Sequence, residues 1–229
     1  AIQEVEWAIK EGLQSIWIPH RAPIGHSPGH VDLEGFWARL AEADVPFVLH
    51  VGGAPLQVSK DWGNNGRAPV KDWLGGGENV RTKDAAVLHQ TPEMFLSVML
   101  LDGVFDRHPR LRGAAVELGA GWVPEMCRRL DWVTRIYGRS DKSVRFDRAP
   151  SQQLIEQMAF TPFSHEDVAY LMEDSHPDLY LFSSDYPHLE GTKDPIGRFE
   201  RFLEHSEPAI RDAFYAENFL RLWPSARVS

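Results

Sequence analysis

The sequence predicts a parallel α/β fold, and three of its features support this prediction. Short apolar runs rich in β-formers alternate with stretches of helical periodicity, which is the pattern of strand–helix–strand units. The run VPFVLHVGG is apolar almost throughout, as expected for a parallel strand covered on both faces. No repeat or linker interrupts the 229 residues, so we expect one domain, 1–229. The expected strands lie at 15–20, 45–53, 111–121, 155–163 and 179–185.

Helices are expected between these strands because of apolar spacing and capping residues. The first covers about 1–11, where apolar residues recur at spacings of three and four, and it ends at Gly12. Asp32 is a preferred N-cap residue for the second helix. Ser164 with Asp167 resembles the capping signal that opens a helix after the fourth strand.

A long polar loop at about 54–85 separates the second strand from the next helix. It is rich in Gly, Asn and Asp. Loops of this length in compact domains are often lids or binding elements, so we expect this one to shape a substrate site. Trp62 and Trp73 lie in the loop and are candidates for covering that site.

Composition restricts the class of partner. The formal net charge is -9 and no Lys/Arg cluster has the density of a nucleic-acid patch, which argues against nucleic acids and anionic membranes. No apolar run approaches the roughly 20 residues of a membrane span. The single cysteine, Cys127, suits a reducing compartment, so we expect a cytoplasmic protein that acts on a small molecule. Motifs of nucleotide binding and serine hydrolysis do not occur in the sequence.

Three of the expected strands end in a residue that can bind a metal or move a proton. These residues are His50, Glu117 and Asp185. The carboxyl ends of parallel strands meet at one edge of the sheet, where functional groups gather. His188 follows Asp185 by three residues and is expected to reach the same pocket, and His20 is a candidate for its rim. Each residue has a simpler explanation, because a lone histidine is often structural and a strand-end carboxylate often caps a helix.

Four stretches, FSSDYPHLEG, VPFVLHVGG, LLDGVFDRHPRLRGAAVELGAGWVPEMCRRLD and AENFLRLW, resemble the amidohydrolase-2 family of metal-dependent enzymes, in the family's own order. The resemblance covers about 1–223. It implies a (β/α)8 TIM barrel, in which this chain supplies strands four to eight. The family's first strand carries an H-x-H pair of metal ligands, and no such strand occurs here. We therefore expect three further units, at least about 90 residues, to precede Ala1.

The resemblance also implies roles for individual residues. His50, Asp185 and Glu117 are expected to bind one divalent metal ion, with zinc the first expectation and iron or manganese the alternatives. Asp185 and Glu117 are expected to be catalytic, moving protons. His188, His20 and Trp122 are expected to bind substrate. Dimers are common in the family, so a homodimer is an assembly that the resemblance allows.

Three functions remain open from the sequence. The first is a hydrolase that uses metal-activated water on an ester, thioester or amide-type bond of a small carboxyl-containing substrate. The second is a metal-dependent non-oxidative decarboxylase or hydratase of an aromatic or unsaturated acid. Decarboxylase-like members carry histidine on strand six where this chain has Glu117, which counts against copying their mechanism directly. The third is a degenerate barrel that binds or scaffolds without catalysis.

Overall fold

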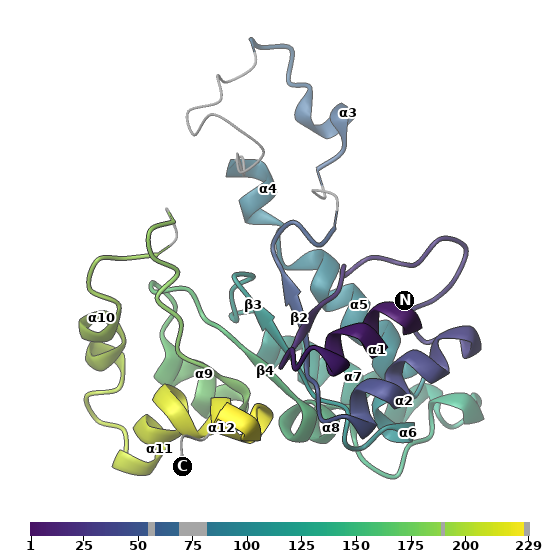
Figure 1. The fold of residues 1–229 in the computed structure, drawn as a ribbon. Coiled ribbons are helices and arrows are strands. Elements are labelled where there is room, and N and C mark those ends of the chain that lie inside the picture. The colour runs from purple at the N-terminus through teal and green to yellow at the C-terminus, as the bar shows by residue number, and fades with distance from the viewer. Residues whose placement is uncertain (55–57, 69–81, 189–190, 227–229) are drawn as a thin grey trace.

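A parallel sheet forms the centre of the protein in a computed structural model, which describes residues 1–54, 58–68, 82–188 and 191–226 (Figure 1). Four strands lie in the order β1-β2-β3-β4, and every neighbouring pair is parallel. Beyond β4, Tyr180 forms a single parallel bridge with Phe160, and the amide of Leu181 donates to the Phe160 carbonyl at 2.9 Å. The strands are β1 Ile16–Trp17, β2 Phe47–His50, β3 Gly113–Val116 and β4 Met158–Phe160.

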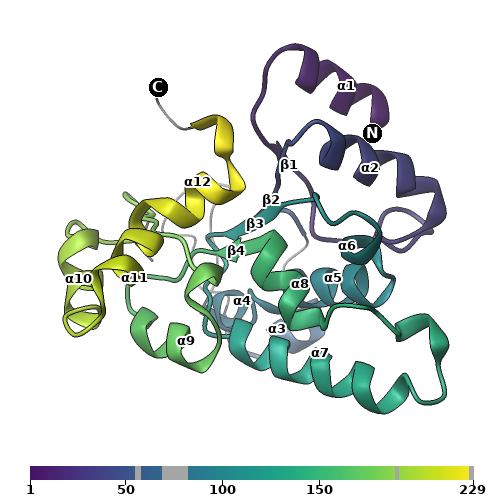
Figure 2. The same cartoon turned by 90° about the horizontal axis from the view of Figure 1, so that it is seen from below.

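Helices such as α5 and α7 cover one face of this sheet, and α12 lies against the other (Figures 1 and 2). Neighbouring helices pack on one another, as α1 does on α2 and α7 on α8. Shorter elements are the 3-10 turns η1 Val31–Leu33, η2 Lys142–Val144, η3 Pro177–Leu179 and η5 Pro224–Ala226, and the π-helical turn η4 Ala213–Glu217. The helices are α1 Ile2–Lys10, α2 Glu34–Glu42, α3 Lys60–Gly63, α4 Thr82–Ala86, α5 Gln90–Leu101, α6 Val104–Arg107, α7 Val123–Tyr137, α8 Pro150–Gln157, α9 Val168–Asp174, α10 Pro195–Phe202, α11 Pro208–Asp212 and α12 Asn218–Leu222. None of the helices in the described ranges combines the length and the apolar character that crossing a membrane requires.

The two faces of the sheet have different packing partners because side chains alternate along a strand. One set of strand residues, including Phe47 and Leu49, packs into the main core against the surrounding helices. The other set, including Ala114 and Ala159, contacts Leu222 and Trp223 at the C-terminal end of the chain. Alternation places His50 on the same face as Val48, which belongs to this second set. His50 therefore projects from the face of the sheet opposite the main core.

The parallel α/β prediction is confirmed, although several predicted boundaries are wrong. The segment predicted as a strand at 155–163 is helix α8 as far as Gln157, followed by three strand residues. The last predicted strand, 179–185, contributes one bridge rather than a ladder. Asp32 is not the N-cap: α2 begins at Glu34, after a 3-10 turn that His30 caps. Asp167 is the N-cap of α9, as the Ser164–Asp167 signal suggested.

The strands of the described part of the chain form an open sheet, with β1 paired on one side only. The polar loop after β2 contains α3 and α4, which rise beyond the end of the sheet in Figure 1. Trp62, on α3, is 78% exposed. Trp73 lies outside the described residues, so the expectation that both tryptophans cover the site stays a prediction.

Candidate active site

Four side chains meet at the carboxyl edge of the sheet, and Glu117 lies at their centre. One of its oxygens, Oε2, lies 2.8 Å from His50 Nε2. The other, Oε1, lies 2.7 Å from His188 Nδ1, and the same nitrogen is 3.2 Å from Asp185 Oδ1. The Glu117 side chain is only 8% exposed, whereas those of His50 and His188 are 42% and 51% exposed. A buried carboxylate thus links two imidazoles that solvent and ligands can reach.

Both carboxylates occupy left-handed backbone conformations. The φ angle is 57° at Glu117 and 49° at Asp185. An L-residue in this region costs about 1–2 kcal/mol, and such outliers gather at functional sites. Both carboxylates contact His188 from these backbone positions. Asp44, the third such residue in the described part of the chain, lies in the turn before β2 and pairs with Arg112.

Side chains beside the turn 117–121 hold it in place. The Glu117 amide donates to Thr161 Oγ1 at 3.0 Å. The indole of Trp122 donates to the carbonyls of Leu118 and Gly119, and its ring packs edge-on against Phe160 at 5.3 Å between centroids. Trp122 is therefore placed under the turn that carries Glu117. Its predicted contact with substrate stays a prediction.

Two residues on β1 and just beyond it surround His50. His20 is 2% exposed, and its Nε2 lies 3.0 Å from the carbonyl of His50. Gly53 approaches His20 so closely that an added Cβ would lie 2.7 Å from the imidazole. Trp17 packs its ring edge-on against the His50 imidazole at 5.8 Å between centroids. His20 thus supports the end of β2, and its predicted place on the rim of the substrate site remains untested.

Electrostatics distinguish His188 from His20. Its hydrogen bond to Glu117 raises the pKa of His188, and the charges of Glu117 and Asp185 act in the same direction. Burial lowers the pKa of His20, which the hydrogen bond to the His50 carbonyl only partly opposes. We therefore assign His20 as neutral and His188 as the imidazole that more readily carries a proton.

The donor atoms of this cluster fit a divalent metal ion. One ligand atom each from Glu117, Asp185 and His188 lie within 4.8 Å of one another. His50 Nδ1 lies 2.8 Å from the carbonyl of Val51. If this nitrogen carries the proton, a neutral His50 presents an unprotonated Nε2 to Glu117 Oε2. Two acceptors 2.8 Å apart require a proton or a cation beside them, and oxygen and imidazole ligands suit zinc or manganese.

A second group with metal-compatible spacing consists of His26, His30 and Asp32, in the loop before α2. Here His30 Nδ1 accepts a hydrogen bond from the Asp32 amide and caps a 3-10 turn, which explains its position without a metal. The group carries no strand-end carboxylate. We therefore place the candidate site at Glu117.

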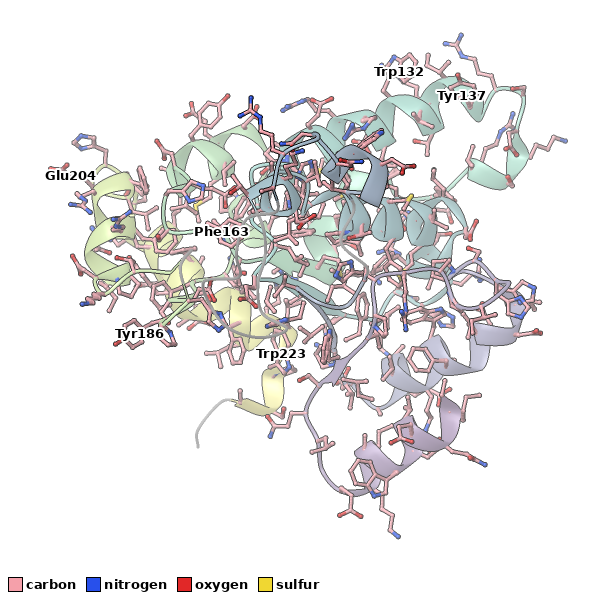
Figure 3. All side chains as sticks on the ribbon, turned by 90° about the horizontal axis from the view of Figure 1, so that it is seen from above. Trp132, Tyr137, Phe163, Tyr186, Glu204 and Trp223 are labelled. Carbon is pink, nitrogen blue, oxygen red and sulfur yellow. The ribbon has the colours of Figure 1, made fainter. Side chains whose placement is uncertain are left out.

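The sequence did not identify three residues of this region as site residues. Thr161, Trp17 and Glu166 each contact a site residue or the turn that carries one. Thr161 directly follows β4, and this position at the carboxyl end of a strand could have indicated that it lies near the site. For Glu166 the sequence offers only an acidic residue near a helix start, which does not reveal that it reaches a different loop. In Figure 3, Phe163, which lies between Thr161 and Glu166 in the sequence, is far from Trp132 and Tyr137 near the C-terminal end of α7.

Comparison with known proteins agrees with this architecture. A solved amidohydrolase, map2389c from Mycobacterium avium subsp. paratuberculosis, is 25% identical with a TM-score of 0.78, over 97% of this chain and 54% of that one. The 5-carboxyvanillate decarboxylase LigW from Sphingomonas paucimobilis shares the fold at 17% identity and a TM-score of 0.66, over 98% of this chain and 62% of that one. Among curated proteins, Decarboxylase orsB from Emericella nidulans is 26% identical over 189 residues, which are 80% of this chain and 53% of that protein.

The chain thus spans about half the length of the curated relative and of the mycobacterial amidohydrolase. The model of the Amidohydrolase family matches residues 15–224, which include all four strands and all four residues of the cluster. The resemblance noted in the sequence is therefore confirmed, and the chain belongs to the amidohydrolase family.

Proposed function

We propose that the protein is a metal-dependent enzyme that removes the carboxyl group of a small aromatic acid without oxidation. The observation that carries this proposal is the chain of contacts from His50 through Glu117 and His188 to Asp185. Such a chain offers imidazole and carboxylate ligands to a cation, and its contact between His188 and Asp185 can pass a proton. The curated relative named as a decarboxylase favours this reaction over the others that the family performs.

In this proposal His50, Glu117 and Asp185 hold the ion, as the sequence predicted. When bound, the ion would neutralise substrate oxygens and lower the pKa of ligands such as water. We propose zinc or manganese, because the donors are imidazole and carboxylate and because solved structures of two decarboxylases of this fold contain manganese.

Proton delivery to the ring carbon is the step that this chain's own residues perform. Decarboxylation breaks the bond between the ring and the carboxyl carbon, and the electron pair stays on the ring carbon and takes up a proton there. Asp185 is placed to deliver that proton and to regain one from His188, whose Nδ1 lies 3.2 Å away. Glu117, which is only 8% exposed, holds the imidazole of His188 in place for this step through the 2.7 Å contact with Nδ1.

Hydrolysis of a carboxyl derivative is the second candidate, and Glu117 is the observation that favours it. Two carboxylates at one site suit removal of a proton from water, because an ionised carboxylate can accept that proton. Neither carboxylate places a fixed positive charge beside the reacting carbon. The same Asp185 would then accept a proton rather than deliver one. We propose a cytoplasmic enzyme with a small-molecule substrate in either case, and a homodimer as its assembly.

The test is metal analysis of the full-length protein followed by a paired assay. We expect about one equivalent of zinc, manganese or iron, lost in His50→Ala and in Asp185→Ala and retained in His205→Ala, an exposed histidine outside the cluster. Folded full-length protein that holds no metal would contradict both catalytic proposals. Release of CO₂ from hydroxylated benzoic acids would identify the decarboxylase, whereas turnover confined to esters, thioesters or amides would identify the hydrolase.

A further inference from the structure

Glu166 binds three backbone amides with one carboxylate. Its Oε1 accepts from the Gly121 amide at 2.6 Å, and its Oε2 accepts from the Phe163 amide at 2.6 Å. The amide of Ala120 lies between the two oxygens, at 3.2 and 3.0 Å. Ala120 and Gly121 belong to the turn after β3, whereas Phe163 belongs to the loop after β4. Glu166 therefore fastens two loops of the carboxyl edge to each other.

The turn that Glu166 holds is the one that carries Glu117. Its chain leaves β3 at Val116, passes through the left-handed Glu117 and Gly119, and enters α7 at Val123. Glycine suits the positions where this turn approaches the next loop. A Cβ at Gly121 would lie 2.9 Å from Glu166 Oε1, and a Cβ at Gly119 would lie 3.0 Å from the ring of Phe163.

The charge of Glu166 also suits its position. The amides of Ala120 and Gly121 immediately precede the 15-residue helix α7, whose N-terminal end is electropositive. Hydrogen bonds between backbone amides and an ionised carboxylate are about twice as strong as those between neutral groups. A carboxylate in this place therefore holds the turn more firmly than an amide side chain of the same shape.

We propose that Glu166 is a positioning residue for Glu117. It does not contact the cluster; it acts through Ala120 and Gly121 on the turn that aims the Glu117 carboxylate between His50 and His188. A left-handed glutamate persists only when its surroundings hold it, and Glu166 supplies hydrogen bonds from a carboxylate on the C-terminal side of Glu117. The consequence for catalysis rests on the function proposed above, whereas the effect on the turn does not.

The test compares Glu166→Gln with two variants of the neighbouring carboxylate, in the full-length protein. Asp167 also accepts a backbone amide, from Tyr170, but it caps only α9. Asp167→Asn removes the same charge one residue away and keeps a good N-cap. Asp167→Ala removes the N-cap of α9, and so lowers the stability of the protein, without touching the turn.

Hydrogen exchange at the amides of Ala120 and Gly121 is the readout that does not depend on activity. We expect these amides to exchange at least about tenfold faster in Glu166→Gln and at the wild-type rate in both Asp167 variants. We further expect Glu166→Gln to weaken Mn²⁺ binding and to lower kcat by about 10–100-fold each, with KM within threefold of wild type. A purely structural role predicts that Asp167→Ala, at matched loss of stability, has the same effects.

The outcomes separate this inference from the proposed function. Unchanged exchange at Ala120 and Gly121 in Glu166→Gln would overturn the positioning role even if the wild-type protein binds metal and turns over substrate. Faster exchange together with unaltered Mn²⁺ affinity and kcat would also overturn it. If the wild-type protein binds none of zinc, manganese and iron, the proposed function fails, and the exchange measurement alone decides whether Glu166 positions the turn.

Discussion

His188 Nδ1 lies 2.7 Å from Glu117 Oε1, although 71 positions separate the two residues in the chain. The contact joins the turn after β3 to the segment that follows the Phe160–Tyr180 bridge. It also raises the pKa of His188. Two loops with no ladder between them are thus linked through one carboxylate, which makes Glu117 the residue on which the site depends most.

Replacing Glu117 by glutamine should reduce turnover far more than it reduces stability. The amide keeps the shape of the side chain but removes the charge that both imidazoles contact. We expect kcat to fall by at least about 100-fold, the usual scale for loss of an acid–base group. Thermal unfolding should shift by only a few degrees, about 1 kcal/mol at this size. Steady-state kinetics and calorimetry measure the two effects.

Glu125→Gln is the matched control for this substitution. Glu125 lies on the exposed side of α7, where its carboxylate forms an ion pair with Arg128 at 3.1 Å. Its variant should retain wild-type kcat. Turnover by Glu117→Gln at the wild-type rate would exclude Glu117 from proton transfer.

Replacing Trp122 by phenylalanine should loosen the turn without emptying the core. The phenyl ring can keep the edge-on packing against Phe160, but the donor to the carbonyls of Leu118 and Gly119 is lost. We expect a loss of about 1–2 kcal/mol in the free energy of unfolding. Urea denaturation measures it, with Trp132→Phe as the control because Trp132 is half exposed. Equal losses in the two variants would show that the indole N–H contributes nothing.

These contacts mark what the sequence could and could not predict. The strand ends near His50 and Glu117 could be predicted from local patterns, because an apolar run and a glycine turn each consist of consecutive residues. The three-residue spacing placed His188 beside Asp185, and the structure has them 3.2 Å apart. By contrast, the role of Glu166 depends on a contact 45 positions away, which no local pattern encodes.

The boundary of β4 was missed for a related physical reason. The apolar residues around Met158 suit a helix or a strand equally well, and short apolar runs do not distinguish the two. Pro150, at the start of α8, sets the N-terminal end of that helix, and packing on α7 stabilises it as far as Gln157. Tertiary contacts therefore decided the conformation that local propensity left open.

Gly113 on β3 should tolerate alanine only if Phe47 becomes smaller. A Cβ at Gly113 would lie 2.6–2.7 Å from three atoms of the Phe47 ring, which is fully buried across the β2–β3 register. We expect Gly113→Ala to lose about 1–3 kcal/mol through overpacking. Adding Phe47→Leu should recover part of this loss, which a double-mutant cycle in urea would show as a coupling energy of about 0.5–3 kcal/mol.

Gly63→Ala serves as the control for the added methyl group. Gly63 ends α3, and no atom lies within 4 Å of a Cβ built there. This variant should have the wild-type free energy of unfolding within about 0.5 kcal/mol. Strict additivity of Gly113→Ala and Phe47→Leu would contradict the steric explanation.

The stabilising effect of Glu34 should disappear at low pH. Its carboxylate accepts two hydrogen bonds from Arg107, each at 3.0 Å, and lies 2.8 Å from His108 Nε2. The hydrogen bonds from Arg107 lower the pKa of Glu34, and the position of Glu34 at the start of α2 is favourable for a negative charge. A carboxylate whose pKa is depressed on folding stabilises the protein above its unfolded-state pKa of about 4.5. This stabilisation is lost as the pH falls through the lower pKa of the folded state.

Glu34→Gln should therefore lower the melting temperature at pH 7 by about 1–3 °C, since the group is partly exposed and solvent screens the pair. Toward pH 3 the melting temperatures of variant and wild type should converge, because the wild-type carboxylate becomes protonated. Glu11→Gln, at an exposed position just after α1, should leave the melting temperature unchanged at both pH values. A difference between Glu34→Gln and wild type that grows on acidification would have the wrong sign for a depressed pKa, and would assign the stabilisation to packing of the side chain instead.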